Sequence, residues 1–118
     1  MSAFGKRLKT LREAKLATDS GFSVRKLAER VGVSPAWISR VETGDAGSPP
    51  SEEVIIKLAE ALGENPIVLL ALADRISSKA KRVILKRPEL FTQMLEDLDN
   101  VPDHAIIRLV REVRDGDW

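Results

Sequence analysis

Residues 23–44 of the chain read SVRKLAERVGVSPAWISRVETG. This stretch consists of two short amphipathic segments joined at a glycine. Ser23 and Ser34 stand where helix N-caps are expected, and Pro35 follows at a first helical position, where its missing N–H costs nothing. Gly32 can adopt the positive φ that a tight turn between two helices demands. These signals predict a helix that ends at Gly32, a short turn and a second helix.

The apolar residues of this stretch are spaced so that the two helices pack against each other at a steep angle. They are Leu27, Ala28, Val31, Val33, Ile38 and Val41. The small side chain of Ala28 lets the two backbones approach closely. This is the helix-turn-helix geometry, in which the second helix enters the major groove of DNA with its first residues against the base edges.

Helical periodicity continues on both sides, and no segment shows the alternation typical of a strand. We expect further helices over residues 3–15, from Ser51 to Gly63 and from Pro66, a helix or linker over residues 75–87, and two last helices from Pro88 and from near Pro102. The chain is therefore predicted to be all-α. Five helices form a DNA-binding domain over residues 1–74, and about two more form a C-terminal extension over residues 75–118.

The charge distribution indicates a partner with many negative charges. The net charge of the 118 residues is only +1. Residues 1–40, however, hold nine Lys or Arg and three acidic residues, whereas residues 41–118 hold ten and fifteen. One end of the molecule is therefore basic, as expected of a protein that binds nucleic acid, although a chance fluctuation of a solvated surface is the alternative.

The composition excludes several classes of function. The sequence has no cysteine, which removes disulfides, thiol catalysis and cysteine-based zinc sites. No apolar run approaches the roughly 20 residues that span a bilayer, so we expect a cytoplasmic protein without a membrane segment. A Gly-rich phosphate loop, an HExxH motif and a nucleophile elbow are also missing. The sequence therefore predicts neither an enzyme nor a cofactor nor a metal site.

The motif resembles the phage-repressor-like (Xre, or Cro and CI) helix-turn-helix family. The matching segments are Leu27-Ala28, Gly32-Val33-Ser34, residues 37–42 (WISRVE), Gly44, residues 50–53 (PSEE) and residues 57–63 (KLAEALG). The resemblance covers residues 4–73 and implies a compact five-helix, repressor-like domain that binds a palindrome as two copies. Helix two of the family usually begins with a Gln, where this chain has Val24, and the loops Leu16–Phe22 and Asp45–Ser48 are long for the family.

The resemblance also implies a set of DNA contacts. It places Pro35, Ala36 and Arg40 where family members read bases. Candidates for phosphate or groove contacts are Ser23, Arg25, Lys26, Ser34, Trp37, Ser39 and Thr43, with weaker ones at Lys6, Arg7 and Lys9. Arg40 is the expected chief reader, because a guanidinium can bond guanine O6 and N7 together. The alternative is a surface arginine paired with an acidic residue.

Two further parts of the motif, the residues Arg12 and Glu42 and the residue Trp37, have expected structural roles. The resemblance implies that Arg12, late in the first helix, bonds Glu42 at the end of the third, as a structural pair that fixes the recognition helix. Trp37 either covers the core from the side or packs on a sugar-phosphate or thymine with its indole N–H on a phosphate.

The C-terminal third leaves three alternatives open. The apolar stripe of Ile106, Leu109, Val110 and Val113 can pack back on the same domain, form a homodimer interface or bind a partner.

The predicted function is a transcriptional regulator, a repressor that binds a palindromic operator in double-stranded DNA as a homodimer. The alternative is an antitoxin-type protein whose C-terminal helices bind a partner protein.

Overall fold

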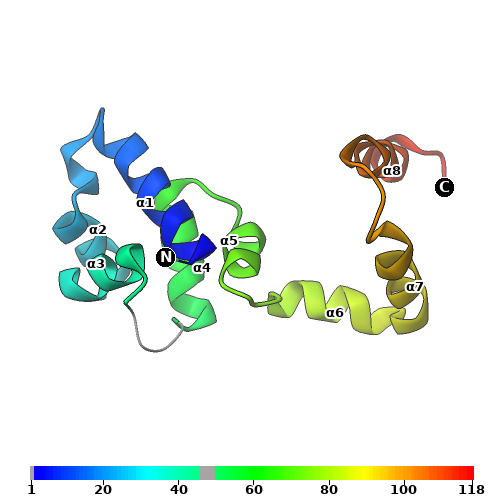
Figure 1. Cartoon of the computed structure of the whole chain (residues 1–118), viewed down its shortest axis with the longest axis horizontal. Coiled ribbons are helices and arrows are strands. Elements are labelled where there is room, and N and C mark those ends of the chain that lie inside the picture. The colour runs from blue at the N-terminus through cyan, green and yellow to red at the C-terminus, as the bar shows by residue number, and fades with distance from the viewer. Residues whose placement is uncertain (1, 46–49) are drawn as a thin grey trace. The chain divides into compact units, whose positions relative to one another are not determined.

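Helices form all the regular secondary structure of the described residues, 2–45 and 50–118, in the computed structural model. The all-α prediction is confirmed. The elements, in chain order, are α1 (Ala3–Leu16), the 3-10 turn η1 (Ser20–Phe22), α2 (Val24–Val31), α3 (Pro35–Thr43), α4 (Glu52–Leu62), α5 (Pro66–Leu72), α6 (Ser78–Lys86), α7 (Pro88–Leu98) and α8 (Asp103–Asp115) (Figure 1). The long loop predicted after the third helix lies, over residues 46–49, outside the described residues.

Serine caps begin three of these helices where the sequence predicted them. The hydroxyl oxygens of Ser23, Ser34 and Ser51 each accept a hydrogen bond from the backbone N–H three residues later. Each bond satisfies one of the N–H groups that the first turn of a helix leaves without a partner. The starts of α2, α3 and α4 are therefore specified by local sequence.

The described chain divides into two compact units, Met1–Ala80 and Lys81–Trp118. In the first unit α1 packs against α3 and α5, while α4 packs against α2 and α5 (Figure 1). The buried side chains of these helices form one apolar cluster: Phe4, Leu8, Phe22, Leu27, Ala28, Val31, Ile38, Val41, Ile55, Leu58, Ala59, Leu62, Leu69 and Leu70. Of the apolar residues of α5, Leu69 and Leu70 are buried, whereas Ile67 and Val68 are exposed.

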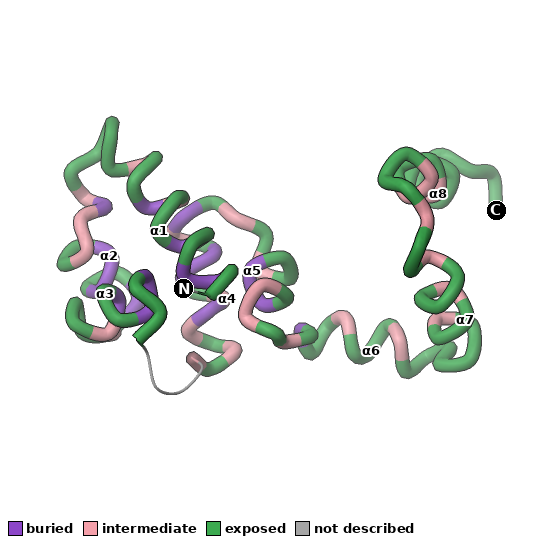
Figure 2. Tube along the Cα trace, viewed as in Figure 1, coloured by how far each residue is buried: buried purple, intermediate pink, exposed green. Residues whose placement is uncertain are grey.

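The second unit has a different character. It contains the end of α6 together with α7 and α8, and none of the described residues of these three helices is buried. Figure 2 shows only exposed and half-buried positions along α7 and α8. The helices of this unit are amphipathic, so much of their apolar surface faces solvent in the single chain.

Candidate nucleic-acid interface

The turn between α2 and α3 is built on Gly32. Its φ is 76°, in the left-handed region, and its N–H donates to the Ala28 carbonyl oxygen. A Cβ at this position would meet no atom within 4 Å. The backbone conformation, not the available space, therefore favours glycine. Two residues after this glycine, the Ser34 cap starts α3.

Two contacts hold α3 against α1. Arg12 donates from Nε and Nη2 to the two carboxylate oxygens of Glu42, at 2.7 and 2.9 Å, and both residues are buried. Donation to Glu42 raises the pKa of the Arg12 guanidinium above its ordinary value, against the opposing effect of burial. Gly5 lies directly beside the Val41 carbonyl oxygen, where a Cβ would be too close. The recognition helix is thus fixed by a charged clamp and by a close backbone approach.

The outer face of α3 is open to solvent. Pro35, Ala36, Ser39 and Arg40 are all exposed. The structure thereby places the three candidate base readers on one helix, with Pro35 and Ala36 in its first turn and Arg40 in its last. Within the described part of the chain, Arg40 makes no ion pair with an acidic side chain, so its guanidinium is available to a ligand.

Trp37 has the core contact that one of its two expected roles requires. Its ring is half-buried and packs against the apolar core. It also lines a hollow of about 380 Å³ between the starts of α3 and α4. The other residues that line the hollow are Val33, Ser34, Arg40, Pro50, Ser51 and Val54. Trp37 therefore supports α3 from the core and also borders a space that Arg40 lines.

The hydroxyls of three candidates, Ser23, Ser34 and Thr43, are engaged in local hydrogen bonds. Ser23 and Ser34 accept from backbone N–H groups as caps, which leaves each hydroxyl proton free to be donated to a phosphate oxygen. The Thr43 hydroxyl lies 3.0 Å from the Ser39 carbonyl oxygen, at the end of α3 farthest from the Ser34 cap. Ser23 is half-buried and the other two are exposed.

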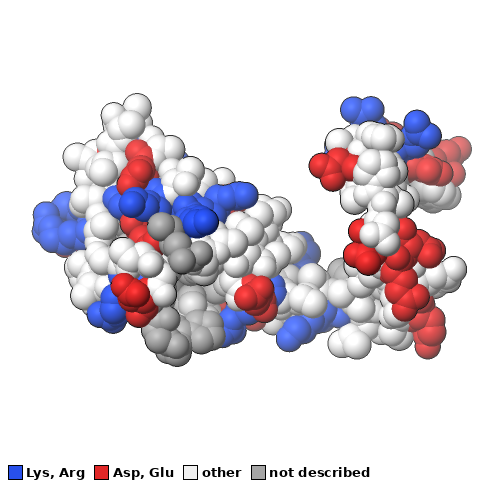
Figure 3. Space-filling view, in the orientation of Figure 1, with Lys and Arg blue, Asp and Glu red and all other residues white. Residues whose placement is uncertain are grey.

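Several basic candidates on α1 and α2 already pair with acidic neighbours. Arg25 and Lys26 share Glu29, at 3.5 and 3.9 Å. Arg7 donates to Glu64 at 2.8 Å. The pKa of Glu64 is lowered, first by the backbone N–H of Asn65 and then by Arg7. Lys9 lies 4.0 Å from Glu13, whereas Lys6 is exposed. Figure 3 shows Lys and Arg side chains over α1 and α2 with acidic groups between them.

Sequence reasoning missed the role of Phe22. This residue ends η1 and is buried, although the segment was predicted to be a loop. The Arg30 guanidinium lies 4.3 Å from the ring centroid, and the Lys15 ammonium lies 5.4 Å from it. An aromatic residue within a polar loop was the available signal. These contacts tie the segment before α2 to α1 and α2.

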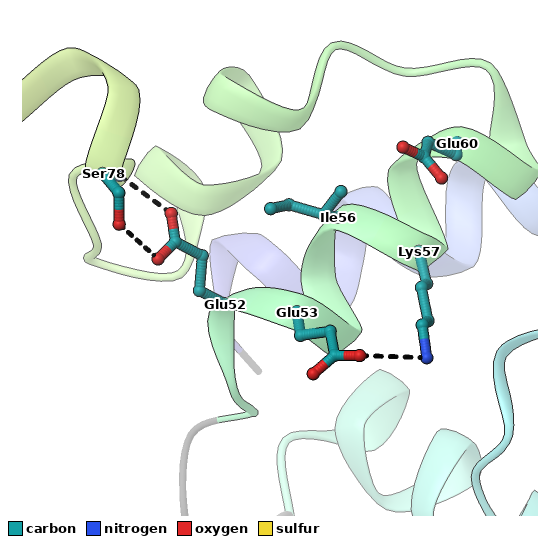
Figure 4. A pocket seen from close by; sticks show the side chains of 6 residues that line it. All are labelled: Glu52, Glu53, Ile56, Lys57, Glu60 and Ser78. Carbon is teal, nitrogen blue, oxygen red and sulfur yellow. Dashed lines mark hydrogen bonds and ion pairs between the residues drawn. The ribbon is translucent and has the colours of Figure 1, made fainter.

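A second hollow, of about 500 Å³, lies along α4 and is acidic. Figure 4 shows Glu52, Glu53 and Glu60 around it, with Ile56 between them. The carboxylate of Glu52 accepts hydrogen bonds from the N–H and the hydroxyl of Ser78, at 2.8 and 2.7 Å. The start of α6 is therefore fixed to α4. Three carboxylates against the one ammonium of Lys57, which pairs with Glu53, make this hollow unfavourable for phosphate, so it lies outside the candidate interface.

The described helices include none that is long and apolar enough to cross a bilayer. A search of the same residues for three or more clustered metal-binding side chains also finds no group.

Residues 3–72 match the family model of a helix-turn-helix domain. Over 62 residues the chain is 47% identical to the HTH-type transcriptional repressor RghR of Bacillus subtilis (strain 168). That alignment covers 52% of this chain and 42% of the relative, so the chain matches less than half of the relative's length. No solved structure matches the chain significantly.

Proposed function

The chain belongs to the helix-turn-helix domain family, as an Xre-like DNA-binding transcription regulator, and from this premise we propose that it represses transcription by binding a palindromic operator as a homodimer. One observation carries the proposal. α3 is clamped to α1 through the buried Arg12–Glu42 pair, while its opposite face is exposed and carries Arg40 without an ion pair among the described residues. A rigid helix with an open cationic face suits the major groove.

Arg40 is the proposed reader of a guanine. Its guanidinium can donate to O6 and N7 of one base, which is worth about 1–3 kcal/mol of discrimination. Pro35 and Ala36 have no side-chain donors, so their expected contact is with thymine methyl groups. Because direct readout by this helix is sparse, we propose that the shape and deformability of the operator supply part of the specificity.

The phosphate contacts surround this face. The hydroxyls of Ser23, Ser34 and Ser39 and the indole N–H of Trp37 are the proposed uncharged donors. Arg25, Lys26 and Thr43 are further candidates at the edges. Arg25 and Lys26 would exchange Glu29 for a phosphate, a small loss because exposed ion pairs contribute about 0–1 kcal/mol. Such contacts position the protein without reading sequence.

The proposed repression and the proposed palindromic operator have separate support. The relative is named a repressor, and a regulator that occupies an operator can exclude the transcription machinery. A two-fold dimer presents two α3 helices, which read half-sites about 34 Å apart, one turn of DNA.

Selection of duplexes from a random pool by the purified protein tests the proposal. We expect an enriched sequence with two-fold symmetry and at least one invariant guanine per half-site. The Arg40→Ala variant, selected in parallel, should lose the preference at that guanine, whereas Lys57→Ala, an exposed cation on α4, should not. A pool without any enriched sequence would contradict sequence-specific binding.

A further inference from the structure

The C-terminal unit lacks a core of its own. Lys81–Trp118 holds fewer than 40 residues, and none of the described residues of α7 or α8 is buried. Units of this size usually need a disulfide, a metal or oligomerisation to stay folded, and the sequence has no cysteine. Apolar side chains remain exposed on both helices, among them Leu90, Leu95 and Val113. A covering surface is therefore required.

One face of α8 has a self-complementary pattern. Asp103, Ile107, Val110 and Arg114 follow one another at spacings of four, three and four residues, which places them along one side of the helix. All four are exposed, with Ile107 at 50% and Val110 at 45%. Asp103 lies in the first turn of α8 and Arg114 in the last. The face is thus apolar in its centre and oppositely charged at its two ends.

We propose that this face of α8 binds the same face of a second copy of the chain, with the two helices antiparallel. In this arrangement each Asp103 faces Arg114 of the partner subunit, twice by symmetry, and Ile107 packs against Val110 of the partner subunit. A parallel arrangement would set Asp103 against Asp103 and Arg114 against Arg114, which is unfavourable. Within the described residues neither Asp103 nor Arg114 forms an ion pair, so both are available.

The apolar and charged residues contribute differently to the interface. Burial of Ile107 and Val110, with Val113 beside them, supplies the affinity. The exposed ion pairs add little affinity but disfavour the wrong orientation. The inference rests on the proposed function in one respect: this dimer is the one that brings two DNA-binding units to one palindrome.

Charge reversal in the full-length chain tests the interface. The variants are Asp103→Arg, Arg114→Asp and the double variant, each measured by sedimentation in the absence of DNA. Each single variant places like charges opposite each other twice and should weaken self-association about tenfold. The double variant should recover dimerisation, and an equimolar mixture of the two single variants should form heterodimers as stable as the wild type.

The control is Arg108→Asp, which makes the same charge change as Arg114→Asp but on the opposite side of α8, and it should leave dimerisation unchanged. Both single variants also oppose the helix dipole of α8. If loss of the helix were the cause, the double variant would be worse than either, so recovery supports the pairing. A monomeric wild type, single variants that dimerise normally, or a mixture that fails to recover would overturn the proposal.

Binding to a duplex with one half-site separates this proposal from the proposed function. We expect all four variants to bind the half-site like the wild type, because α3 is unchanged, while Asp103→Arg and Arg114→Asp lose affinity for the palindrome and the double variant and Arg108→Asp do not. A wild type that dimerises as described but binds no half-site would remove the proposed function and leave the interface standing.

Discussion

Arg12 of α1 and Glu42 of α3, thirty residues apart, form a buried ion pair with two parallel hydrogen bonds of 2.7 and 2.9 Å. The remaining Nη1 of Arg12 lies 3.4 Å from the Phe22 carbonyl oxygen, so one guanidinium connects three segments of the domain, α1, η1 and α3. Glu42 lies in the same helix as Arg40. The pair therefore connects the stability of the domain to the orientation of its DNA-reading helix.

Arg12→Ala should lower the free energy of unfolding by about 3–5 kcal/mol, because it leaves the Glu42 carboxylate buried without its partner. Arg7→Ala is the matched control in the same helix, since it removes an ion pair whose arginine is exposed, and it should lower the free energy of unfolding far less. Urea denaturation of the three proteins gives both values. Equal losses would show that burial of the Arg12 pair is energetically unimportant.

Gly5→Ala should destabilise the protein even though alanine is the better helix former by about 1 kcal/mol. The added Cβ would be forced against the Val41 backbone carbonyl, so α1 and α3 would have to separate. Thermal unfolding should show a lower Tm, while Lys6→Ala, at the exposed neighbouring position, should leave Tm nearly unchanged. A higher Tm for Gly5→Ala would mean that the two helices do not approach so closely.

Arg40→Ala should weaken binding to the selected operator by about 1–3 kcal/mol and flatten the preference at a single base pair per half-site. The fold should be unaffected, because this side chain is exposed and unpaired within the described residues. Titrations with operators altered one base pair at a time measure the preference. If the variant were weakened equally on every sequence, Arg40 would be a phosphate contact.

Trp37 should report on DNA binding by its fluorescence. The other tryptophan, Trp118, is 83% exposed at the C-terminus, so Trp118→Phe leaves Trp37 as the sole emitter. Operator DNA should protect this variant from acrylamide quenching, because the hollow beside the ring would be covered. The converse variant, Trp37→Phe, should show no such protection. Unchanged quenching of Trp37 at saturating DNA would assign the ring to the core alone.

Local signals in the sequence were sufficient to predict the helix starts and the turn. The hydroxyls of Ser23, Ser34 and Ser51 each cap a helix by bonding an N–H group only three residues later in the chain. Gly32 adopts the predicted positive φ. The close approach at Gly5 could not be predicted in this way, because it depends on where α3 packs in three dimensions.

Two other differences between the sequence prediction and the structure also arise from packing in three dimensions. Phe22 packs in the apolar core with Lys15 and Arg30 beside its ring, and no helical or strand periodicity of the polar segment around it reveals these contacts. The helix predicted from Pro66 is apolar along its whole length. A seven-residue helix, however, presents only one side to that core, so Ile67 and Val68 stay outside. Sequence alone also could not show that the Arg40 guanidinium is left available to a ligand.

The most direct test of the central claim, that α3 reads a specific duplex sequence, is fluorescence anisotropy of the selected palindrome and a scrambled duplex at several salt concentrations. We predict a Kd for the palindrome at least about 1,000-fold lower than that for the scrambled duplex at the same salt, with affinity for both falling as salt rises. Equal affinities for the two duplexes at every salt concentration would contradict the account, because the protein would then bind only the phosphate backbone.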